Sequence, residues 1–335
     1  MKKKILVTGG AGFMGSHLAD QLINEGHEVV VVDNLSGGYL ENVNKKATFI
    51  KGDLQDKKVC DRAVEGVDMV YHLAAHAAEG QSIFCPVYNA KSNYIGFLQL
   101  LESSINSDVK TFIHTSSMSV YGKQLKMPMR ENQPYNPKDP YAVGKQAMEQ
   151  VLSIYHDVFG INYSILIPHN VYGERQNLSD PYRNAVAIFM NRVIVGKPPI
   201  IFGDGNQTRA FTYVRDCTPY IAKAGFTKSA FGERINIGTE EVTSLNELSK
   251  LVLEVMGRTD LKPIYAPERP SEVKHSYCSS KKAERILGYK TSTPLKQGLI
   301  NMKKWVEKVG HRDFKYWDEL EIKKKAPKVW LNKMQ

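Results

Sequence analysis

Cysteine is scarce in this sequence, and long apolar runs are missing from it. The four cysteines, Cys60, Cys85, Cys217 and Cys278, are scattered and form no CxxC pair, so we expect neither a metal site nor a disulfide framework. Free thiols suit a reducing compartment, which favours a cytoplasmic location. No apolar run approaches the roughly 20 residues that a membrane helix needs, and the run after Lys4 is too short for a signal peptide. We therefore expect no membrane association.

Positive charge is in excess, but its pattern is not typical of nucleic-acid binding. The formal net charge is +10 over 335 residues. Apart from Lys2–Lys4 and Lys323–Lys325, the basic residues are spread along the chain, and no zinc-finger, RRM or KH signature is present. A phosphate-rich small substrate would account for part of the excess, so we do not expect a nucleic-acid partner.

A glycine-rich turn near the N-terminus is the most informative motif. Gly9, Gly12 and Gly15 follow the apolar run Ile5–Val7 and open an amphipathic stretch that predicts a helix over Phe13–Glu25. Glycine lets the backbone approach a ligand closely, and the helix N-terminus offers free N–H groups and a positive dipole to a diphosphate. The strand, turn and helix together predict a dinucleotide site.

An acidic residue lies where such a site requires one. The predicted strand Glu28–Val32 is followed by Asp33, 18 residues after Gly15, where a carboxylate can accept hydrogen bonds from the adenosine ribose hydroxyls. A carboxylate repels a 2′-phosphate, and residues 34–38 contain no Arg or Lys that would bind one. The sequence therefore favours NAD over NADP as the cofactor.

Strands and helices alternate in the first half of the chain, which predicts an α/β fold with a doubly wound, Rossmann-like parallel sheet. The predicted strands are Lys4–Val7, Glu28–Val32, Thr48–Lys51, Met69–Leu73, Thr111–His114 and Tyr163–Ile167. The predicted helices are Phe13–Glu25, Lys57–Val64, Val87–Ile105, Tyr141–Phe159 and Tyr182–Val195. Ligands of such sheets bind beyond the carboxyl ends of the strands, where the candidate residues converge.

The second half is less regular and predicts a smaller, mixed α/β lobe that caps this crevice. A capping box at Ser244–Glu247 opens a helix that runs to Met256, and further helices are expected over Lys281–Leu287 and Leu295–Val309. We expect a cofactor domain of residues 1–167, with a return segment at about 211–238, and a substrate lobe of residues 168–210 and 239–335. Residues 314–335 carry no readable motif.

A tyrosine, a lysine and a serine form a candidate proton-transfer group. Tyr141 and Lys145 share one face of the predicted helix because they are four residues apart. An ammonium near a phenol favours the phenolate, so we expect Lys145 to lower the pKa of Tyr141. A tyrosine tuned in this way can take a proton from a sugar hydroxyl near neutral pH. Ser117 ends the fifth predicted strand, where its hydroxyl can bond the same substrate hydroxyl.

These motifs resemble those of the extended short-chain dehydrogenase/reductases, within the nucleotide-sugar epimerase/dehydratase family. The matching segments run over nearly the whole chain and are TGGAGFMG (8–15), VVDNLSGG (31–38), GDL (52–54), HLAA (72–75), SSMSVYG (116–122), YAVGK (141–145), HNVYG (169–173), GDGNQTRAFTYVRD (203–216) and INIGTEEVTSLNEL (235–248). The resemblance implies bound NAD and a nucleotide-diphosphate-sugar substrate, with UDP-sugars favoured. It also implies a homodimer built on the predicted helices Val87–Ile105 and Tyr141–Phe159.

The resemblance further implies roles for individual residues. Ser117, Tyr141 and Lys145 would be catalytic. The cofactor would contact Gly9, Gly12, Phe13, Met14, Gly15, Asp33, Asn34, Ser36, Gly37, Asp53, Leu54, Leu73, Ala74, Ala75, Asn93, Tyr141 and Lys145. The substrate would contact Glu79, Ser117, Asn170, Arg209, Arg269 and Ser276. The two arginines would bind the diphosphate, because an arginine fork suits phosphate oxygens.

The residues after Ser117 bear on which reaction of this family the chain performs. A 4-epimerase forms a transient 4-keto sugar and returns the hydride to its other face, which needs only the serine, tyrosine and lysine. A 4,6-dehydratase also needs an acid and a base, usually an Asp-Glu pair, whereas Met118 and Ser119 stand here. Related UDP-glucuronate decarboxylases usually carry a Glu in this segment, and 3,5-epimerases a Cys, and neither is present.

The sequence thus favours a 4-epimerase for a substrate of the UDP-glucose or UDP-N-acetylglucosamine type, a class whose products usually feed polysaccharide synthesis. The alternatives are the related enzymes and a non-catalytic NAD-sensing protein, which the intact catalytic set disfavours. An alignment from Arg269 places Ser276 where 4-epimerases for N-acetylated sugars have a small residue, although a one-residue gap would place Tyr277 there. Glu79 would border the sugar, as a solvated loop acid or as a contact to an unusual group.

Overall fold

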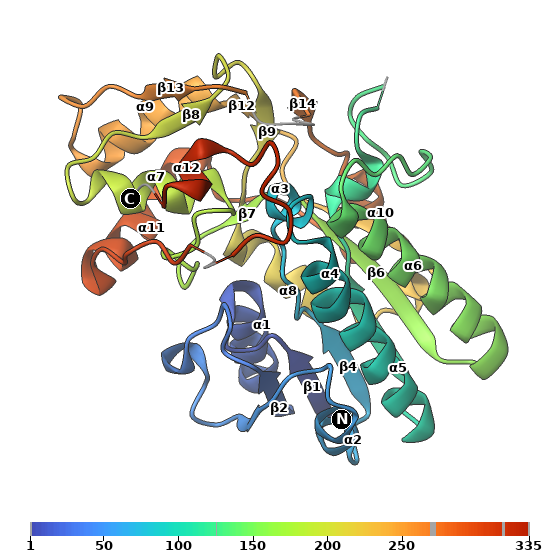
Figure 1. Cartoon of the computed structure of the whole chain (residues 1–335). Helices are drawn as coiled ribbons and strands as arrows, with labels where there is room; N and C mark the ends of the chain where they lie inside the picture. Colours follow the sequence, from blue (N-terminus) through green and yellow to red (C-terminus); the bar gives the residue numbers. More distant parts are fainter. Residues whose placement is uncertain (1, 125, 269–272, 317–318, 334–335) are drawn as a thin grey trace.

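A seven-stranded parallel sheet forms the centre of the protein in the computed structural model, which describes residues 2–124, 126–268, 273–316 and 319–333 (Figure 1). In spatial order its strands are β11 (Arg234–Ile237), β6 (Asn162–Pro168), β5 (Thr111–Thr115), β4 (Met69–His72), β1 (Lys4–Thr8), β2 (Glu28–Asp33) and β3 (Thr48–Lys51). Every neighbouring pair is parallel. The predicted doubly wound sheet is confirmed, and β11 is a strand that the sequence pattern did not indicate.

Helices cover both faces of this sheet because successive strand residues point to opposite sides. The helices are α1 (Phe13–Asn24), α2 (Lys57–Val64), α3 (Glu79–Ser82), α4 (Pro86–Ala90), α5 (Gly96–Asn106), α6 (Pro140–Phe159), α7 (Ala185–Val193), α8 (Thr218–Ala224), α9 (Leu245–Met256), α10 (Lys281–Leu287), α11 (Leu295–Val309) and α12 (Lys328–Leu331). Ile5 and Val7 pack with α1 and α8, whereas Leu6 packs with α2, α5 and α6. Burial on both faces explains the continuous apolar run of β1.

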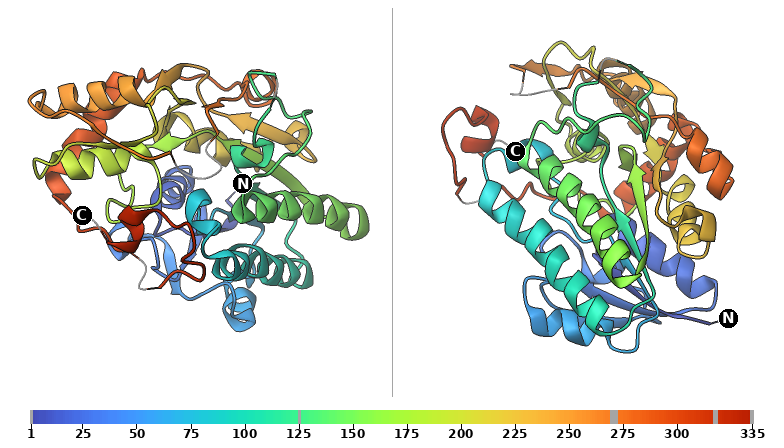
Figure 2. Two further views of the ribbon diagram at one scale, coloured as in Figure 1. Left: turned by 45° about the horizontal axis from the view of Figure 1, so that its top comes forward. Right: turned by 90° about the vertical axis from the view of Figure 1, so that its right-hand side faces the viewer.

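The second lobe is built from short strands and the helices α7, α9 and α11 (Figure 2). Its strands are β7 (Val171–Tyr172), β8 (Ile200–Phe202), β9 (Thr208–Ala210), β10 (Thr212–Tyr213), β12 (Val242–Ser244), β13 (Ile264–Ala266) and β14 (His275–Ser276). The predicted capping box is present, because Ser244 Oγ accepts from Glu247 N while the Glu247 carboxylate accepts from Ser244 N. The predicted mixed α/β lobe is therefore confirmed.

Two helices depart from the sequence prediction. The predicted helix Tyr182–Val195 begins only at Ala185, because the Asn184 side chain accepts from Val186 N and so caps the helix there. The predicted helix Val87–Ile105 is interrupted by a π-helical turn over Lys91–Ile95. Such turns are rare and often occur at functional sites.

Among the described residues no helix has both the length and the apolar character that crossing a bilayer demands. The four cysteines are buried and free. A reducing, cytoplasmic environment stays a prediction.

A buried carboxylate joins the sheet to α6. Glu149 accepts hydrogen bonds from the Ser116 hydroxyl at the end of β5 and from the Tyr135 hydroxyl at 2.9 Å. Arg234, the first residue of β11, pairs with the same carboxylate at 2.6 Å between Nε and Oε2. The Glu149 side chain is only 1% exposed. One carboxylate therefore fixes the end of β5, the middle of α6 and the sheet edge relative to one another.

Removing this carboxylate should destabilise the protein strongly. We expect Glu149→Leu to lower the free energy of unfolding by about 3–5 kcal/mol, because the largely buried charge of Arg234 then loses its carboxylate partner. Chemical denaturation would measure this loss. Glu102→Leu is the matched control, since Glu102 is 58% exposed and should change stability by less than about 0.5 kcal/mol. A loss below about 1 kcal/mol for Glu149→Leu would contradict the role given to this residue.

Candidate active site

A cavity of about 520 Å³ opens at the carboxyl ends of the central strands. The chain order reverses between β1 and β4, which is where ligands of such sheets bind. The predicted site residues that line this cavity are Gly9, Gly12, Phe13, Met14, Gly15, Asp33, Asn34, Ser36, Gly37, Asp53, Leu54, Leu73, Ala74, Ala75, Glu79, Ser117, Tyr141, Lys145, Asn170, Arg209 and Ser276. Arg269 lies outside the described residues.

The glycine turn holds a conformation that side chains would prevent. Gly9 has a φ of +67°, and a Cβ there would lie 2.9 Å from backbone atoms of Ala74. A Cβ on Gly15 would lie 2.2 Å from the Gly9 carbonyl oxygen. Gly12 begins α1 and offers no side-chain cap, so the first N–H groups of the helix remain open to a ligand. This turn fits a dinucleotide diphosphate.

Asp33, at the end of β2, has a carboxylate that backbone N–H groups hold in place. Its carboxylate accepts from Leu35 N at 2.7 Å and from Ala11 N at 3.1 Å. Burial nevertheless raises the pKa of this carboxyl, and the backbone donors only partly oppose the shift. Nearby, Asn34 Nδ2 donates to the Asp53 carboxylate at 2.8 Å. The residues that would hold the adenosine end of NAD are therefore ordered by hydrogen bonds among themselves.

The start of α6 places Tyr141 in the cavity. Pro140 occupies the first turn, and the Asp139 side chain accepts from Ala142 N at 2.8 Å as the N-cap. The backbone N–H of Tyr141 donates to Ser82 Oγ at 3.2 Å, which ties α6 to α3. Only 5% of the Tyr141 surface is exposed.

Lys145 is one turn further along α6 and almost completely buried. Its Nζ donates to the carbonyl oxygen of Thr115 at 2.7 Å and lies 5.9 Å from the centre of the Tyr141 ring. Burial lowers the pKa of Lys145 to about 7, and the charge of Glu149 opposes this shift. A large fraction of Lys145 is therefore a neutral amine near pH 7, where an exposed lysine is almost entirely protonated.

The expected lowering of the Tyr141 pKa is wrong for this structure. Burial raises the pKa of Tyr141, and the negative charge of Glu79 raises it further. A hydrogen bond with Ser117 opposes the rise but does not overcome it. The prediction failed because it counted the ammonium of Lys145 but not the desolvation of both side chains, which weakens each charged form.

Ser117 is oriented by its own loop. It caps a short 3₁₀ turn, Met118–Tyr121, and its Oγ accepts from Ser119 N at 3.2 Å. The Ser119 hydroxyl also donates to Ser117 Oγ, at 2.9 Å. With two donors directed at its oxygen, Ser117 has its proton available for Tyr141 or for a substrate oxygen.

The substrate side of the cavity includes Arg209 and Ser276, which are partners in the register between β9 and β14. Arg209 is held by its Nη1, which donates to the carbonyl oxygens of Thr208 at 2.9 Å and Lys274 at 3.1 Å. Ser276 faces the cavity, whereas Tyr277 is not part of its lining. The alignment that assigns Ser276 to the sugar stays a prediction.

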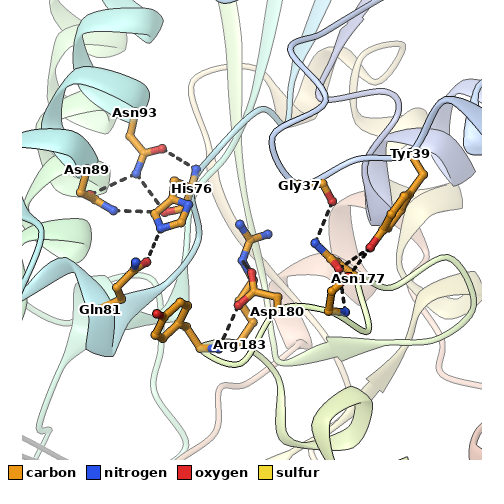
Figure 3. A network of polar contacts seen from close by, with 11 residues as sticks. Gly37, Tyr39, His76, Gln81, Asn89, Asn93, Asn177, Asp180 and Arg183 are labelled. Atoms are coloured by element: carbon orange, nitrogen blue, oxygen red, sulfur yellow. Dashed lines mark hydrogen bonds and ion pairs between the residues drawn. The ribbon is translucent and has the colours of Figure 1, made fainter. Parts of the chain in front are cut away.

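Asn93 does not line the cavity. Its Oδ1 accepts from His76 N at 2.7 Å, and its Nδ2 donates to the His76 carbonyl at 3.2 Å, as Figure 3 shows. Asn89 donates to the same carbonyl at 3.1 Å. Both asparagines come from α4 and the π-helical turn. In this structure Asn93 supports the loop after β4 rather than facing a ligand.

Sequence reasoning missed His76, Asn177, Asp180 and Arg183, which also line the cavity. Arg183 pairs with Asp180 at 2.7 Å between Nε and Oδ2. Burial lowers the pKa of His76 to about 4, and the positive charge of Arg183 contributes to this shift. The false assignment of residues 182–184 to a helix hid Arg183, whereas the Asn184 cap could have revealed a loop there.

Asn177 connects the loop before α7 with the loop after β2, which contains Gly37 and Tyr39 (Figure 3). The Tyr39 hydroxyl donates to Asn177 Oδ1 at 2.7 Å, and Asn177 Nδ2 donates to the Gly37 carbonyl at 3.2 Å.

Within the described ranges no cluster of three or more His, Cys, Asp or Glu residues could hold a metal ion.

The fold and the site define an enzyme of the nicotinamide-dinucleotide-binding type. Comparison with known families narrows this class to one family. The NAD dependent epimerase/dehydratase family matches residues 5–238. The chain belongs to this family.

Several relatives match along most of their length. A putative UDP-glucose 4-epimerase of Methanocaldococcus jannaschii is 39% identical over 308 residues, which are 90% of this chain and 98% of that protein. The structure of the UDP-glucose 4-epimerase of Thermotoga maritima with UDP-glucose is 38% identical, has a TM-score of 0.87 and covers 91% of this chain and 99% of its own. The structure of a UDP-N-acetylglucosamine 4-epimerase of Methanobrevibacter ruminantium M1, in complex with UDP-N-acetylmuramic acid, is 33% identical and has a TM-score of 0.84. The match covers 92% of this chain and 100% of that one.

The buried lysine should make stability depend on pH. The pKa of Lys145 falls from 10.5 to about 7 on folding, so between these values the unfolded chain holds a proton that the folded chain lacks. Stability therefore rises with pH in this window, by at most about 1.4 kcal/mol per pH unit.

We expect the unfolding free energy of the wild type, minus that of Lys145→Met, to increase as the pH is raised from 7 to 9 in denaturation experiments. Lys110→Met, which alters a lysine that is 76% exposed, should keep the wild-type slope. Parallel curves for the wild type and Lys145→Met would refute the perturbed lysine.

Proposed function

We propose that this protein is an NAD-dependent nucleotide-sugar 4-epimerase that acts on a UDP-hexose of the UDP-glucose or UDP-N-acetylglucosamine type. The observation that carries the proposal is the group Ser117, Tyr141 and Lys145 in one cavity, with Met118 and Ser119 in the segment where a dehydratase needs carboxyl groups. The named 4-epimerases that resemble the chain over about nine tenths of its length support the same reaction.

The chain's own residues would manage the proton of the sugar. Ser117 hydrogen-bonds the C4 oxygen, and Tyr141 accepts the C4 hydroxyl proton as the carbonyl forms, then returns it after the 4-keto sugar has turned. Bound NAD supplies the acceptor and donor of the hydride. Because burial raises the pKa of Tyr141, its phenolate is a strong base once formed. Before it accepts the sugar proton, Tyr141 must give up its own phenol proton, and Lys145, whose pKa is about 7, is the adjacent amine that would take it and carry the positive charge.

The remaining predicted contacts follow from their place in the cavity. The glycine turn and Asp33 would hold NAD, and Arg209 would bind the substrate diphosphate through its guanidinium. Ser276, which pairs with Arg209 in the β9–β14 register, has a small side chain that would leave room for a 2-acetamido group. Asn170 and Glu79 would border the sugar.

The direct test is to incubate the purified protein and NAD with UDP-glucose, UDP-N-acetylglucosamine, UDP-glucuronate and GDP-mannose, and to follow products by NMR. We expect a C4 epimer of a UDP-hexose without net formation of NADH. A 4-keto-6-deoxy product would replace the proposal with a dehydratase. Binding of NAD without turnover of any donor would favour the sensing protein.

The catalytic tyrosine gives a second check on the same reaction. Tyr141→Phe should retain the fold and bound NAD yet lower turnover by about 10²-fold or more, the usual scale of general acid–base catalysis. Tyr155→Phe, on the same helix but outside the cavity lining, should keep wild-type turnover. Near-full activity in Tyr141→Phe would remove this residue from the mechanism.

We further propose that the protein is a homodimer. Apolar side chains on one face of α6 are exposed, namely Val143, Ile154 and Val158, at 54%, 56% and 65%. Val87 on α4 and Ile95 in the π-helical turn add to this surface at 56% and 41%. Since α4 and the π-helical turn pack against α6, these exposed side chains lie on neighbouring elements, and a second copy of the same helices would cover them.

Light scattering would test this association. We expect a mass of twice 37.8 kDa for the wild type and of one chain for the double variant Ile154→Glu, Val158→Glu. Val242→Glu, at an exposed valine of the second lobe, should leave the dimer intact. A monomeric wild type, or a dimer that survives the double substitution, would disprove this interface.

A further inference from the structure

The chain after α11 crosses the molecule and returns to the cofactor half. We call residues 310–316 and 319–333 the C-terminal strap; it appears red in Figure 1, running from α11 past α3 to α12. It lies outside the family match of residues 5–238. The relatives described above align over 98–100% of their own lengths but over 90–92% of this chain. These shares leave room for an element that the relatives lack.

The beginning of the strap is anchored to both lobes. Asn191 of α7 donates through Nδ2 to the Arg312 carbonyl at 2.7 Å and accepts from Arg312 N at 3.0 Å. The Arg312 guanidinium lies 3.9 Å from the centre of the Tyr39 ring and pairs with Glu41. Arg312 thus bridges from the second lobe to the loop after β2.

The middle of the strap is anchored to the start of α4. The Glu321 carboxylate accepts from Val87 N at 2.9 Å and from Tyr88 N at 2.8 Å. Ile322 N donates to the Phe84 carbonyl at 2.9 Å. A carboxylate at the N-terminus of a helix is favourable because it satisfies free N–H groups there.

The end of the strap forms part of the cavity wall. Trp330 and Pro327 both line the cavity, and Trp330 is only 5% exposed. Its ring packs edge-on against Phe84 and Tyr182, with ring centres 5.8 Å and 5.0 Å apart. Together with Leu320 and Ala326, these residues form an apolar cluster separate from the two main cores.

Trp330 is connected to the catalytic tyrosine through α3. Its Cη2 atom lies 3.3 Å from the position that a Cβ on Gly80 would take, so the indole covers this glycine closely. Glu79, the preceding residue, is near enough to raise the pKa of Tyr141. Ser82, at the other end of α3, accepts from the Tyr141 N–H at 3.2 Å. The indole therefore lies at the end of the cavity where Tyr141 acts, away from the adenosine end at Asp33.

We propose that the C-terminal strap completes the sugar subsite and that Trp330 is a specificity-determining residue whose indole contacts the hexose of the nucleotide sugar. This rests on the proposed function for the identity of the ligand. A rigid indole fixed by two aromatic rings presents apolar surface with little entropy to lose on binding. It limits the space beside Glu79 and Gly80 and excludes water from the reacting sugar.

The test compares a ligand that has the sugar with one that lacks it. Binding of UDP and of the best UDP-hexose would be measured by calorimetry on the NAD-loaded wild type and on Trp330→Ala. We expect Trp330→Ala to weaken UDP-hexose binding about tenfold and to raise KM similarly, while UDP binding and kcat change much less. Trp330→Phe, which keeps a ring, should recover part of the loss, and it replaces Trp330→Ala if that variant does not fold.

Two further variants distinguish the proposed sugar contact of Trp330 from a general disturbance of the fold. Leu331→Ala changes the neighbouring residue, which is 44% exposed, and should match the wild type. Glu321→Gln loosens the anchor at α4 without touching the cavity and should weaken UDP-hexose more than UDP.

Equal effects of Trp330→Ala on UDP and UDP-hexose, or no effect on either, would overturn the sugar contact. Faster turnover with unchanged KM would mean that the strap obstructs the site instead of completing it. Should the wild type epimerise none of the donors, the proposed function fails, yet the difference between UDP and UDP-sugar binding still decides the role of Trp330.

Discussion

The buried carboxylate of Glu149 is the constraint on which the rest of the active site depends. It lies one helical turn after Lys145 and binds Ser116, the residue before Ser117. Through Arg234 it also fixes β11 at the edge of the sheet. Ser117 and Lys145 come from different elements, and this side chain, together with the hydrogen bond from Lys145 to the Thr115 carbonyl, holds them in place relative to each other. It also provides the negative charge that limits the fall in the Lys145 pKa.

Desolvation governs the chemistry of the site. It lowers the pKa of Lys145 to about 7 and raises that of Tyr141. Both shifts disfavour the charged forms, so the pair does not carry a fixed ammonium and phenolate. Sequence spacing cannot reveal this, because it places two residues on one helix face without saying how deeply they are buried. The same limit applies to Asp33, whose carboxyl pKa is raised by burial although its donors are backbone groups.

Short-range patterns predicted the parts of the fold that have local causes. Gly9, Asp33 and the capping box at Ser244 lie where turn, strand-end and helix-start rules place them. The π-helical turn and the strand β11 depend on contacts between distant segments, so no local signal reports them. The strap is the extreme case, because residues without a motif acquire their place from Phe84, Tyr182 and the start of α4.

The order of the strap and the glycine turn along the chain has a consequence for how the molecule is made. During synthesis the glycine turn and the first strands emerge early, and domains generally fold from the N-terminus. β11 completes the sheet only after residue 237 has been added, and Trp330 follows 93 residues later. A nascent chain can thus possess the glycine turn and the strand ends of the crevice well before the residues of the strap that line the cavity have been added.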